Sequence, residues 1–232
     1  MERKPSVTKS CRKEIIVLTF AMFLGFSAVP ECEDNVMVKL PHPRLTSSTS
    51  VEKALSERRS VRSFTIQPLS IEDVSQICWS AQGTTNERGY RTAPSGGALY
   101  PLELYIAVGN VAGLSEGLYR YEPMRHSIVM IKKGNVIPAL CKASYNQSCI
   151  RESSIVLVFS SVWERITKKY GERGRRYALI EAGHASQNVY LQAETLGLGT
   201  VAVGAFLDDE VKKIVGLQNG EDPLYMMPVG KK

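Results

Sequence analysis

Apolar residues recur from residue 50 onward at two spacings, which predict helices and strands interspersed along the chain. Intervals of three and four residues predict helices at the ranges 51–57, 136–144, 175–196 and 208–215, and one more that starts after Ser70. Alternating or continuous apolar runs predict strands at 102–108, 117–121, 127–131, 155–159, 201–206 and 224–229. Residues 163–174 are charged and are expected to form a loop or lid. The interspersed order predicts an α+β or α/β class.

Capping residues support several of these boundaries. Ser50 and Ser70 precede their helices, and Asp73 stands where the carboxylate of a capping box would lie. Gly197 is expected to end the helix at 175–196.

The N-terminal part of the chain has a different pattern. A basic stretch precedes residues 15–29, which carry no charge, so residues 1–30 predict a secretory signal or an uncleaved membrane anchor. Residues 31–49 are rich in proline, serine and threonine and are interpreted as a linker to a folded domain at 50–232. Localisation is left open between export, membrane anchoring and the cytoplasm.

Composition narrows the function classes. The apolar content of 44% and charged content of 22% are ordinary for a globular protein. The net charge is +6, and half of this excess lies within residues 1–30. No basic and aromatic stripe or nucleic-acid motif is present, so we expect no nucleic-acid partner.

Cysteine and histidine spacing predicts no metal site. The five cysteines form no CxxC and no Cys/His ligand pattern. Glu181 and His184 are a single pair, whereas a di-iron site of this kind needs two such pairs and further carboxylates. Whether Cys141 and Cys149 form a disulfide is left open.

Two stretches carry candidate binding chemistry. The run Arg58-Arg59-Ser60-Val61-Arg62 suits bidentate recognition of a phosphate, with a solvated basic turn as the alternative. The loop from Pro94 to Pro101 contains adjacent glycines whose N–H groups could approach a planar or anionic ligand, with a plain connector as the alternative. A P-loop, a dinucleotide-binding turn and a GxSxG nucleophile motif are all absent from the sequence.

Five motifs in order resemble the nitroreductase superfamily of flavoproteins, and within it the SagB-type group that includes azoline dehydrogenases. They are the arginine run, Gln82-Gly83-Thr84, Pro94–Pro101, the EAGHASQN stretch at 181–188, and Pro228-Val229-Gly230-Lys231. The resemblance covers about residues 50–232 and leaves out the N-terminal segment.

The resemblance implies an FMN-binding α+β fold with a central mixed sheet flanked by helices, and a homodimer with flavin at the subunit interface. It assigns the phosphate and ribityl end of FMN to the arginine run and the C-terminal lysines, other ribityl or ring contacts to residues that follow the second helix, and the two sides of the isoalloxazine ring to the glycine loop and to residues 202–204. The implied cofactor-binding residues are Arg58, Arg59, Ser60, Arg62, Gln82, Thr84, Pro94, Ser95, Gly96, Gly97, Ala98, Ala202, Val203, Gly204, Lys231 and Lys232.

A Lys-Tyr pair is the proposed acid/base element in peptide-modifying members, and Lys169 and Tyr170 stand in the corresponding place. A charged surface loop is the alternative for this pair. His184, Gln187 and Asn188 are interpreted as structural residues of the core or of a dimer.

The function implied is an FMN-dependent oxidoreductase that transfers hydride through flavin N5, acting on a small molecule with NAD(P)H or oxygen as second partner. The alternatives are an azoline dehydrogenase acting on a heterocyclised peptide, and a flavin-binding protein without turnover.

Overall fold

The computed structural model describes residues 36–232 together with Met1. The expected signal or anchor at 1–30, with its apolar run at 15–29, lies outside the described residues. Within the described part, no helix is long and apolar enough to cross a bilayer.

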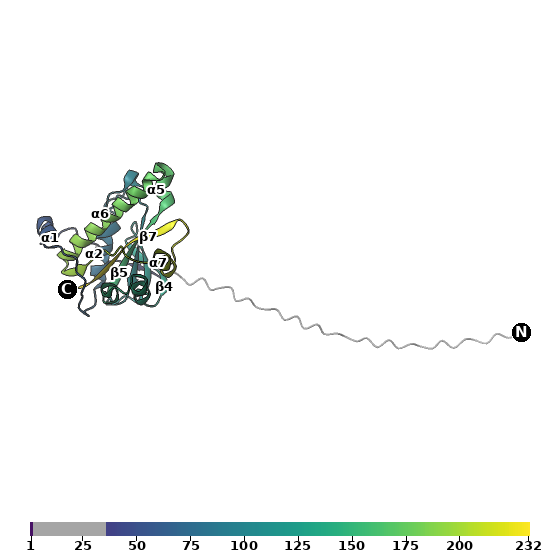
Figure 1. Cartoon of the computed structure of the whole chain (residues 1–232), viewed down its shortest axis with the longest axis horizontal. Helices are drawn as coiled ribbons and strands as arrows, with labels where there is room; N and C mark the ends of the chain where they lie inside the picture. The colour runs from purple at the N-terminus through teal and green to yellow at the C-terminus, as the bar shows by residue number, and fades with distance from the viewer. Residues whose placement is uncertain (2–35) are drawn as a thin grey trace. The chain divides into compact units, whose positions relative to one another are not determined.

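Helices and strands are interspersed through this domain (Figure 1). The strands are β1 (Met37–Lys39), β2 (Leu102–Val108), β3 (Gly117–Glu122), β4 (Ser127–Lys133), β5 (Ile155–Val162), β6 (Leu198–Thr200) and β7 (Glu221–Lys231). The helices are α1 (Val51–Glu57), α2 (Ile71–Gln82), the 3-10 turn η1 (Gly96–Ala98), α3 (Ile137–Ala143), α4 (Ser148–Arg151), α5 (Trp163–Tyr170), α6 (Arg173–Thr195) and α7 (Asp208–Val215).

The strands form a single sheet in the order β1-β4-β3-β2-β5-β7-β6. Every neighbouring pair is antiparallel. The expected α+β class is therefore confirmed, but the expectation of a mixed sheet is wrong.

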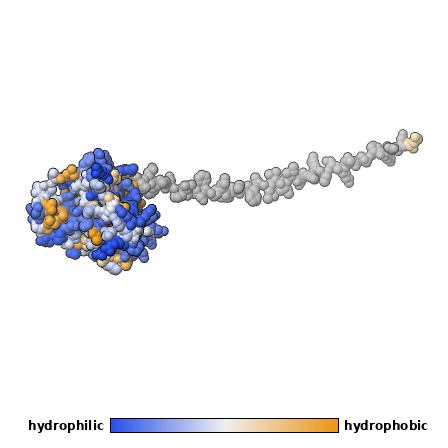
Figure 2. Space-filling view, turned by 90° about the horizontal axis from the view of Figure 1, so that it is seen from above, coloured by the Kyte–Doolittle hydropathy of each residue, from blue (hydrophilic) through white to orange (hydrophobic). Residues whose placement is uncertain are grey.

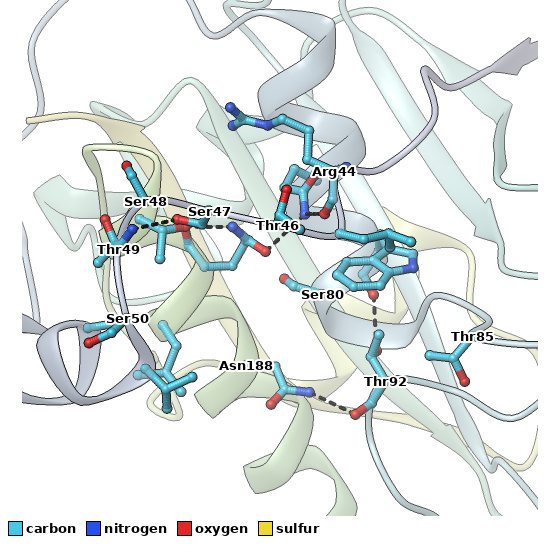
Figure 3. A pocket seen from close by; sticks show the side chains of 18 residues that line it. Arg44, Thr46, Ser47, Ser48, Thr49, Ser50, Ser80, Thr85, Thr92 and Asn188 are labelled. Atoms are coloured by element: carbon cyan, nitrogen blue, oxygen red, sulfur yellow. Dashed lines mark hydrogen bonds between the residues drawn. The ribbon is translucent and has the colours of Figure 1, made fainter.

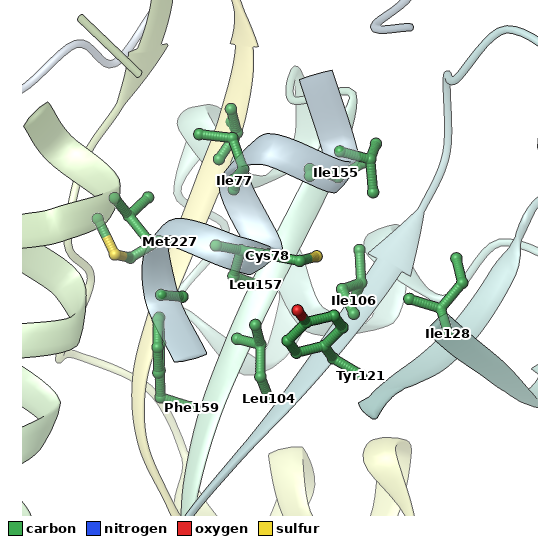
Figure 4. Close-up of a cluster of buried hydrophobic side chains, with 14 of the residues drawn as sticks. Ile77, Cys78, Leu104, Ile106, Tyr121, Ile128, Ile155, Leu157, Phe159 and Met227 are labelled. Atoms are coloured by element: carbon green, nitrogen blue, oxygen red, sulfur yellow. The ribbon is translucent and has the colours of Figure 1, made fainter. Parts of the chain in front are cut away.

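The sheet is buried on both faces, because its inner strands are apolar at successive positions. Leu104 and Ile106 of β2 face α2 and α6, whereas Tyr105 and Ala107 face α3, α4 and α7. Figure 4 shows the first layer, with Ile77 and Cys78 of α2 above Leu104, Leu157 and Phe159. The opposite orientation of successive side chains along a strand explains how one strand supplies both cores.

Local sequence accounts for the two helices that cover the first face. Ser70 and Asp73 form a capping box at the start of α2, as expected. Helix α6 is 23 residues long and turns a stripe of mostly small residues toward the sheet, which allows close packing: Ala182, Ala185, Val189 and Ala193 all belong to the core on this face.

Two expectations about the elements are corrected. Residues 163–170, expected as loop or lid, form α5, whose single buried side chain is Ile166. The strand expected at 201–206 is absent; pairing is confined to β6, and beyond it only Val203 forms an isolated bridge, with Met226. Apolar spacing did not predict these two elements, because α5 has few apolar positions and β6 is short.

The expectation that residues 31–49 form a linker is also wrong for the second half of this range. Residues 37–39 pair with β4 as strand β1, and Leu40 is buried. The backbone N–H of Arg44 donates to Gln76 Oε1 at 2.8 Å. The carbonyl oxygen of Pro41 accepts from Ser75 Oγ at 2.6 Å and lies 2.9 Å from His126 Nε2. This stretch is therefore packed on the domain.

The cysteines whose pairing was left open are free. Cys141 and Cys149 are both buried thiols on the second face of the sheet.

Candidate functional site

Residues 58–65 run beside strands β6 and β7. The N–H of Val61 donates to the carbonyl of Thr200 and that of Thr65 to Lys231, both at 2.9 Å. Glycine is required in the strands beneath: a Cβ on Gly199 would lie 2.6 Å from Val61 Cγ1, and one on Gly230 would lie 2.7 Å from Phe64 Cγ. The arginine run is thus fixed at the β6 end of the sheet.

Tyr190 of α6 joins this run to the segment that follows β6. Its hydroxyl accepts from the N–H of Ala202 at 2.7 Å and lies 3.1 Å from Ser60 Oγ. The guanidinium of Arg58 lies over its ring, 5.1 Å from the centroid. Predicted site residues from two distant parts of the sequence, Arg58 and Ser60 on one side and Ala202 on the other, are therefore brought together. We refer to Arg58, Ser60, Tyr190 and Ala202 as the tyrosine cluster.

The remaining residues of these two segments lie at the surface or in the adjoining sheet. Arg59 and Arg62 are exposed, and Arg59 donates to the carbonyl of Ser56 at 3.0 Å. Val203 is buried by its bridge to Met226, whereas Gly204 is exposed with open space at its Cα. Arg59, Arg62 and Gly204 thus remain accessible to a ligand.

The two C-terminal lysines are paired with carboxylates. Lys231 Nζ lies 2.8 Å from Asp73 Oδ2, and Lys232 Nζ lies 2.7 Å from Glu194 Oε2. Asp73 is also the capping-box residue of α2. A phosphate at either lysine would have to compete with a carboxylate, and their cofactor role stays a prediction.

The second half of the glycine loop donates its N–H groups within the loop itself. The N–H of Ala98 donates to the carbonyl of Ser95 at 3.0 Å, and the N–H of Tyr100 donates to Ser95 Oγ at 2.9 Å. Gly97 has φ +63°, a left-handed conformation that favours glycine. Pro94 and Gly97 are exposed.

The end of α5 meets this loop. A Cβ on Gly97 would lie 2.7 Å from Tyr170 Oη and 2.9 Å from Lys169 Nζ. Tyr170 packs edge-on against Tyr177 of α6, with ring centroids 5.2 Å apart. The candidate acid/base pair and the candidate ring-binding loop are therefore in contact, although Gly97 and Lys169 are 72 positions apart in the sequence.

Glu181 lies beneath the same loop with only 5% of its surface exposed. Its Oε1 accepts from the N–H of Gly96 at 2.8 Å. Burial raises the pKa of this carboxyl, an effect opposed by the hydrogen bonds from Gly96 and Ser95 and by the nearby charges of His184 and Arg91. We call Glu181, Lys169, Tyr170 and residues 94–98 the loop cluster.

Gln82 and Thr84 join neither cluster. Gln82 is buried, and its amide oxygen accepts from Arg91 at 2.7 Å. Thr84 donates to the carbonyl of Pro123 at 3.2 Å. Arg91 also lies over the ring of Tyr100, 4.5 Å from its centroid, so Gln82 supports the loop through Arg91. A ribityl or ring contact by these two residues stays a prediction.

Sequence reasoning did not identify the roles of Tyr190 and Glu181. Both lie on α6, nine residues apart, which corresponds to about 13 Å along a helix axis at ~1.5 Å per residue. The sequence offered one chemical indication of these roles. A phenol or carboxylate that is buried on a long alanine-rich helix needs a polar partner.

A hollow of about 630 Å³ lies between residues 44–50, α1, α2 and the C-terminal half of α6 (Figure 3). Its polar groups are mostly neutral hydroxyls and amides, and Asn188 donates across it to the carbonyl of Thr92 at 3.2 Å. None of the predicted cofactor residues lines it. The described residues contain no group of three or more potential metal ligands.

Comparisons with known proteins bear on the family and the fold. The profile of the Nitroreductase family matches residues 55–231. The chain is 46% identical over 199 residues to a Methanocaldococcus jannaschii protein named as a nitroreductase (MJ1384), covering 86% of this chain and 98% of that protein. It is 28% identical over 155 residues to the Escherichia coli microcin B17-processing protein McbC, covering 64% of this chain and 57% of McbC. The crystal structure of a Ralstonia eutropha JMP134 protein described as a nitroreductase superimposes with a TM-score of 0.74 at 26% identity, covering 84% and 89% of the two chains.

Proposed function

Because this chain belongs to the nitroreductase family, whose members are generally flavin-dependent oxidoreductases, we propose that it binds FMN and transfers hydride between that flavin and a small molecule. The observation that carries the proposal is the tyrosine cluster, which sets a half-buried arginine and a serine hydroxyl beside the backbone of Ala202. The guanidinium of Arg58 and the hydroxyl of Ser60 suit a phosphate, and the backbone at Ala202 suits the edge of a flat ring.

The residues at hand fit this cofactor. Arg58 is held by stacking on Tyr190, so less of its side-chain freedom is lost when a phosphate binds. Arg59 and Arg62 are exposed near the same turn and add positive charge. Gly204 presents backbone with no side chain in the way. When bound, flavin supplies the hydride chemistry, and the protein supplies donors and charge around its ring nitrogens.

Lys169 and Tyr170 are proposed to hold or deliver a proton to the substrate. They contact Gly97 at the tip of the loop, so they would lie next to any ring seated on that loop. Substituting them is expected to affect turnover more than flavin binding.

We also propose a homodimer. Helix α6 leaves Leu179 and Ile180 55% and 48% exposed, and Gly183 on the same face has open space above it. Figure 2 shows a largely hydrophilic surface on which apolar areas are small and separate, so an apolar strip on the longest helix is a favourable contact for a second copy. Sedimentation velocity of the purified protein should give the dimer mass.

The test of flavin binding uses the purified full chain. The purified protein should be yellow, with an absorbance maximum at about 450 nm. After its flavin is removed, the apoprotein should quench the fluorescence of added FMN. Replacing both Arg58 and Arg62 by alanine should weaken FMN binding at least about 100-fold, because charge-assisted bonds to phosphate contribute about 1.5–3 kcal/mol each. Arg125→Ala, at an exposed arginine of the β3–β4 turn, is the matched control. A protein that takes up no FMN would contradict the proposal.

A second candidate function is dehydrogenation of an azoline ring in a peptide. It is favoured by the similarity to McbC, a microcin-processing protein, together with the contact between the Lys-Tyr pair and the loop. Flavin reduction by NADH or NADPH in an anaerobic stopped-flow experiment supports the small-molecule reductase. Turnover only with a heterocyclised peptide supports the alternative, and bound flavin that no donor reduces supports a binding protein without turnover.

A further inference from the structure

The buried carboxylate of Glu181 has a single backbone donor in the structure. Its Oε1 lies 2.8 Å from the N–H of Gly96, and a Cβ on Gly96 would stand 3.5 Å from the same oxygen. Glu181 is on the rigid helix α6, packed between the buried Ala178 and Ala185. The helix therefore provides a fixed acceptor for an otherwise surface-exposed loop.

The hydrogen bonds within the loop decide which donors remain. Pro94 has no N–H, Gly96 donates to Glu181, and Ala98 donates to Ser95. The N–H groups of Ser95 and Gly97 have no partner among the described residues. The N–H groups of Gly96 and Ala98 are thus engaged, whereas those of Ser95 and Gly97 are available to a ligand.

We propose that Glu181 is a positioning residue: by holding Gly96 it keeps the N–H groups of Ser95 and Gly97 free to donate to an acceptor atom of the bound ligand, beside Lys169 and Tyr170. The inference rests on the proposed function, since the ligand would be the flavin ring or the substrate seated on it. A carbonyl oxygen or an unprotonated ring nitrogen is the chemistry that two such amides recognise.

The arrangement at Gly97 explains why the register of the loop matters. Gly97 sits at φ +63° and touches both Lys169 and Tyr170. If Gly96 were released, rotation of the adjoining peptide groups would turn the Gly97 N–H away and would also move the point against which the Lys-Tyr pair packs. The hydrogen bond from Gly96, together with that from the Ser95 side chain, therefore lets Glu181 fix both the free N–H groups and the residues beside them.

The test compares Glu181→Met with Glu181→Gln by hydrogen exchange of the amides of residues 94–100 in the flavin-free protein. Methionine keeps the shape but accepts no N–H, so the Gly96 amide should exchange at least about tenfold faster, the equivalent of about 1.4 kcal/mol. Glutamine retains an amide oxygen and should stay within about threefold of the wild type. Glu172→Gln, at an exposed carboxylate preceding α6, should change nothing. Equal exchange of Gly96 in wild type and Glu181→Met would overturn the inference.

FMN binding separates this inference from the proposed function. If the wild type binds FMN, Glu181→Met should raise the dissociation constant about tenfold or more and alter the visible circular dichroism of the flavin, and Glu181→Gln should restore both. Unchanged affinity and spectrum in Glu181→Met would overturn the inference while leaving the function intact. If the wild type binds no FMN, the function fails, whereas the exchange data still decide whether Glu181 holds the loop.

A wild-type measurement covers the case in which a variant does not fold. The amide resonance of Gly96 should move as Glu181 titrates, at a pH above the ordinary range of a glutamate because burial raises its pKa, since protonation of the carboxylate weakens the hydrogen bond that it accepts from Gly96. A Gly96 resonance that does not move while Glu181 titrates would contradict the hydrogen bond and with it the inference.

Discussion

The hydroxyl of Tyr190 accepts a hydrogen bond of 2.7 Å from the backbone N–H of Ala202. This bond connects the longest helix to the segment that leaves the sheet after β6, where regular strand pairing has ended. The same hydroxyl reaches Ser60 at 3.1 Å. A single phenol therefore sets the spacing between the arginine run and the backbone expected beside the flavin ring.

Removing this hydroxyl tests its role. Tyr190→Phe keeps the ring beneath Arg58 but leaves the Ala202 N–H without its acceptor. At about 1 kcal/mol for a net hydrogen bond, FMN should bind about fivefold to tenfold more weakly, as measured by quenching of flavin fluorescence. Tyr145→Phe, at an exposed tyrosine with 62% of its surface accessible, is the control. Equal affinities in all three proteins would show that the tyrosine cluster does not shape the cofactor site.

The Lys-Tyr pair should act on turnover. Lys169→Ala and Tyr170→Phe are expected to lower kcat about 100-fold or more, in the range by which general acid-base catalysis contributes, while FMN affinity stays within about threefold. Lys168→Ala provides the neighbouring control, since Lys168 is exposed on the same helix. If the pair is a charged surface feature only, all three variants will turn over like the wild type.

Gly230→Ala should destabilise the domain. Its Cβ would lie 2.7 Å from Phe64 Cγ inside a buried part of β7, and overpacking of this kind costs about 1–3 kcal/mol. Urea unfolding should show the loss, and FMN affinity should fall as well because residues 58–65 are pushed from the sheet. Lys213→Ala, at an exposed position of α7 on the opposite face of the sheet from α6, should be neutral or stabilising. Equal stability of the two variants would contradict the packing described here.

Stability should fall in mild acid because of His126. Burial lowers the pKa of this imidazole from the ordinary value of 6.5, against a raising effect of the Pro41 carbonyl and a lowering effect of His42. As the pH falls, His126 therefore takes up a proton in the unfolded chain before it does so in the folded protein. The free energy of unfolding consequently decreases as the pH falls below about 6.5.

His126→Asn isolates this contribution, because asparagine tolerates the positive φ of 45° at this position. Between about pH 7.5 and pH 5.5 the urea midpoint of the wild type should fall relative to that of the variant. Parallel curves would show that the proton on His126 is not linked to folding.

The sequence predicted those elements whose apolar spacing and caps agree. The bounds of α1 and α7 were correct because Ser50 and a run of acidic residues mark their starts. Helix α5 was missed because only Ile166 is buried, and β6 because strand pairing there spans only Leu198–Thr200.

The candidate site divides in the same way. Arg58, Ser60 and the glycine loop were predicted because they belong to five motifs that occur in the order of the nitroreductase pattern, whereas each stretch alone also fits a connector or a solvated turn. Tyr190 and Glu181 are not recognisable, since a tyrosine or glutamate on a long helix is ordinary until its partners Ala202 and Gly96 are known. Those partners come from tertiary packing, which local spacing does not encode.

The pairing of Met37–Lys39 with β4 has a practical consequence for making the protein. With β1 in place, residues 127–129 of β4 are covered by a neighbouring strand. A chain beginning at residue 40 would leave that row of N–H and C=O groups open, next to the buried Ile128 and Val129. Open strand edges recruit other chains. The shortened protein should therefore self-associate through β4, and that aggregation would say nothing about the tyrosine cluster, which lies beside β6 at the other end of the strand order.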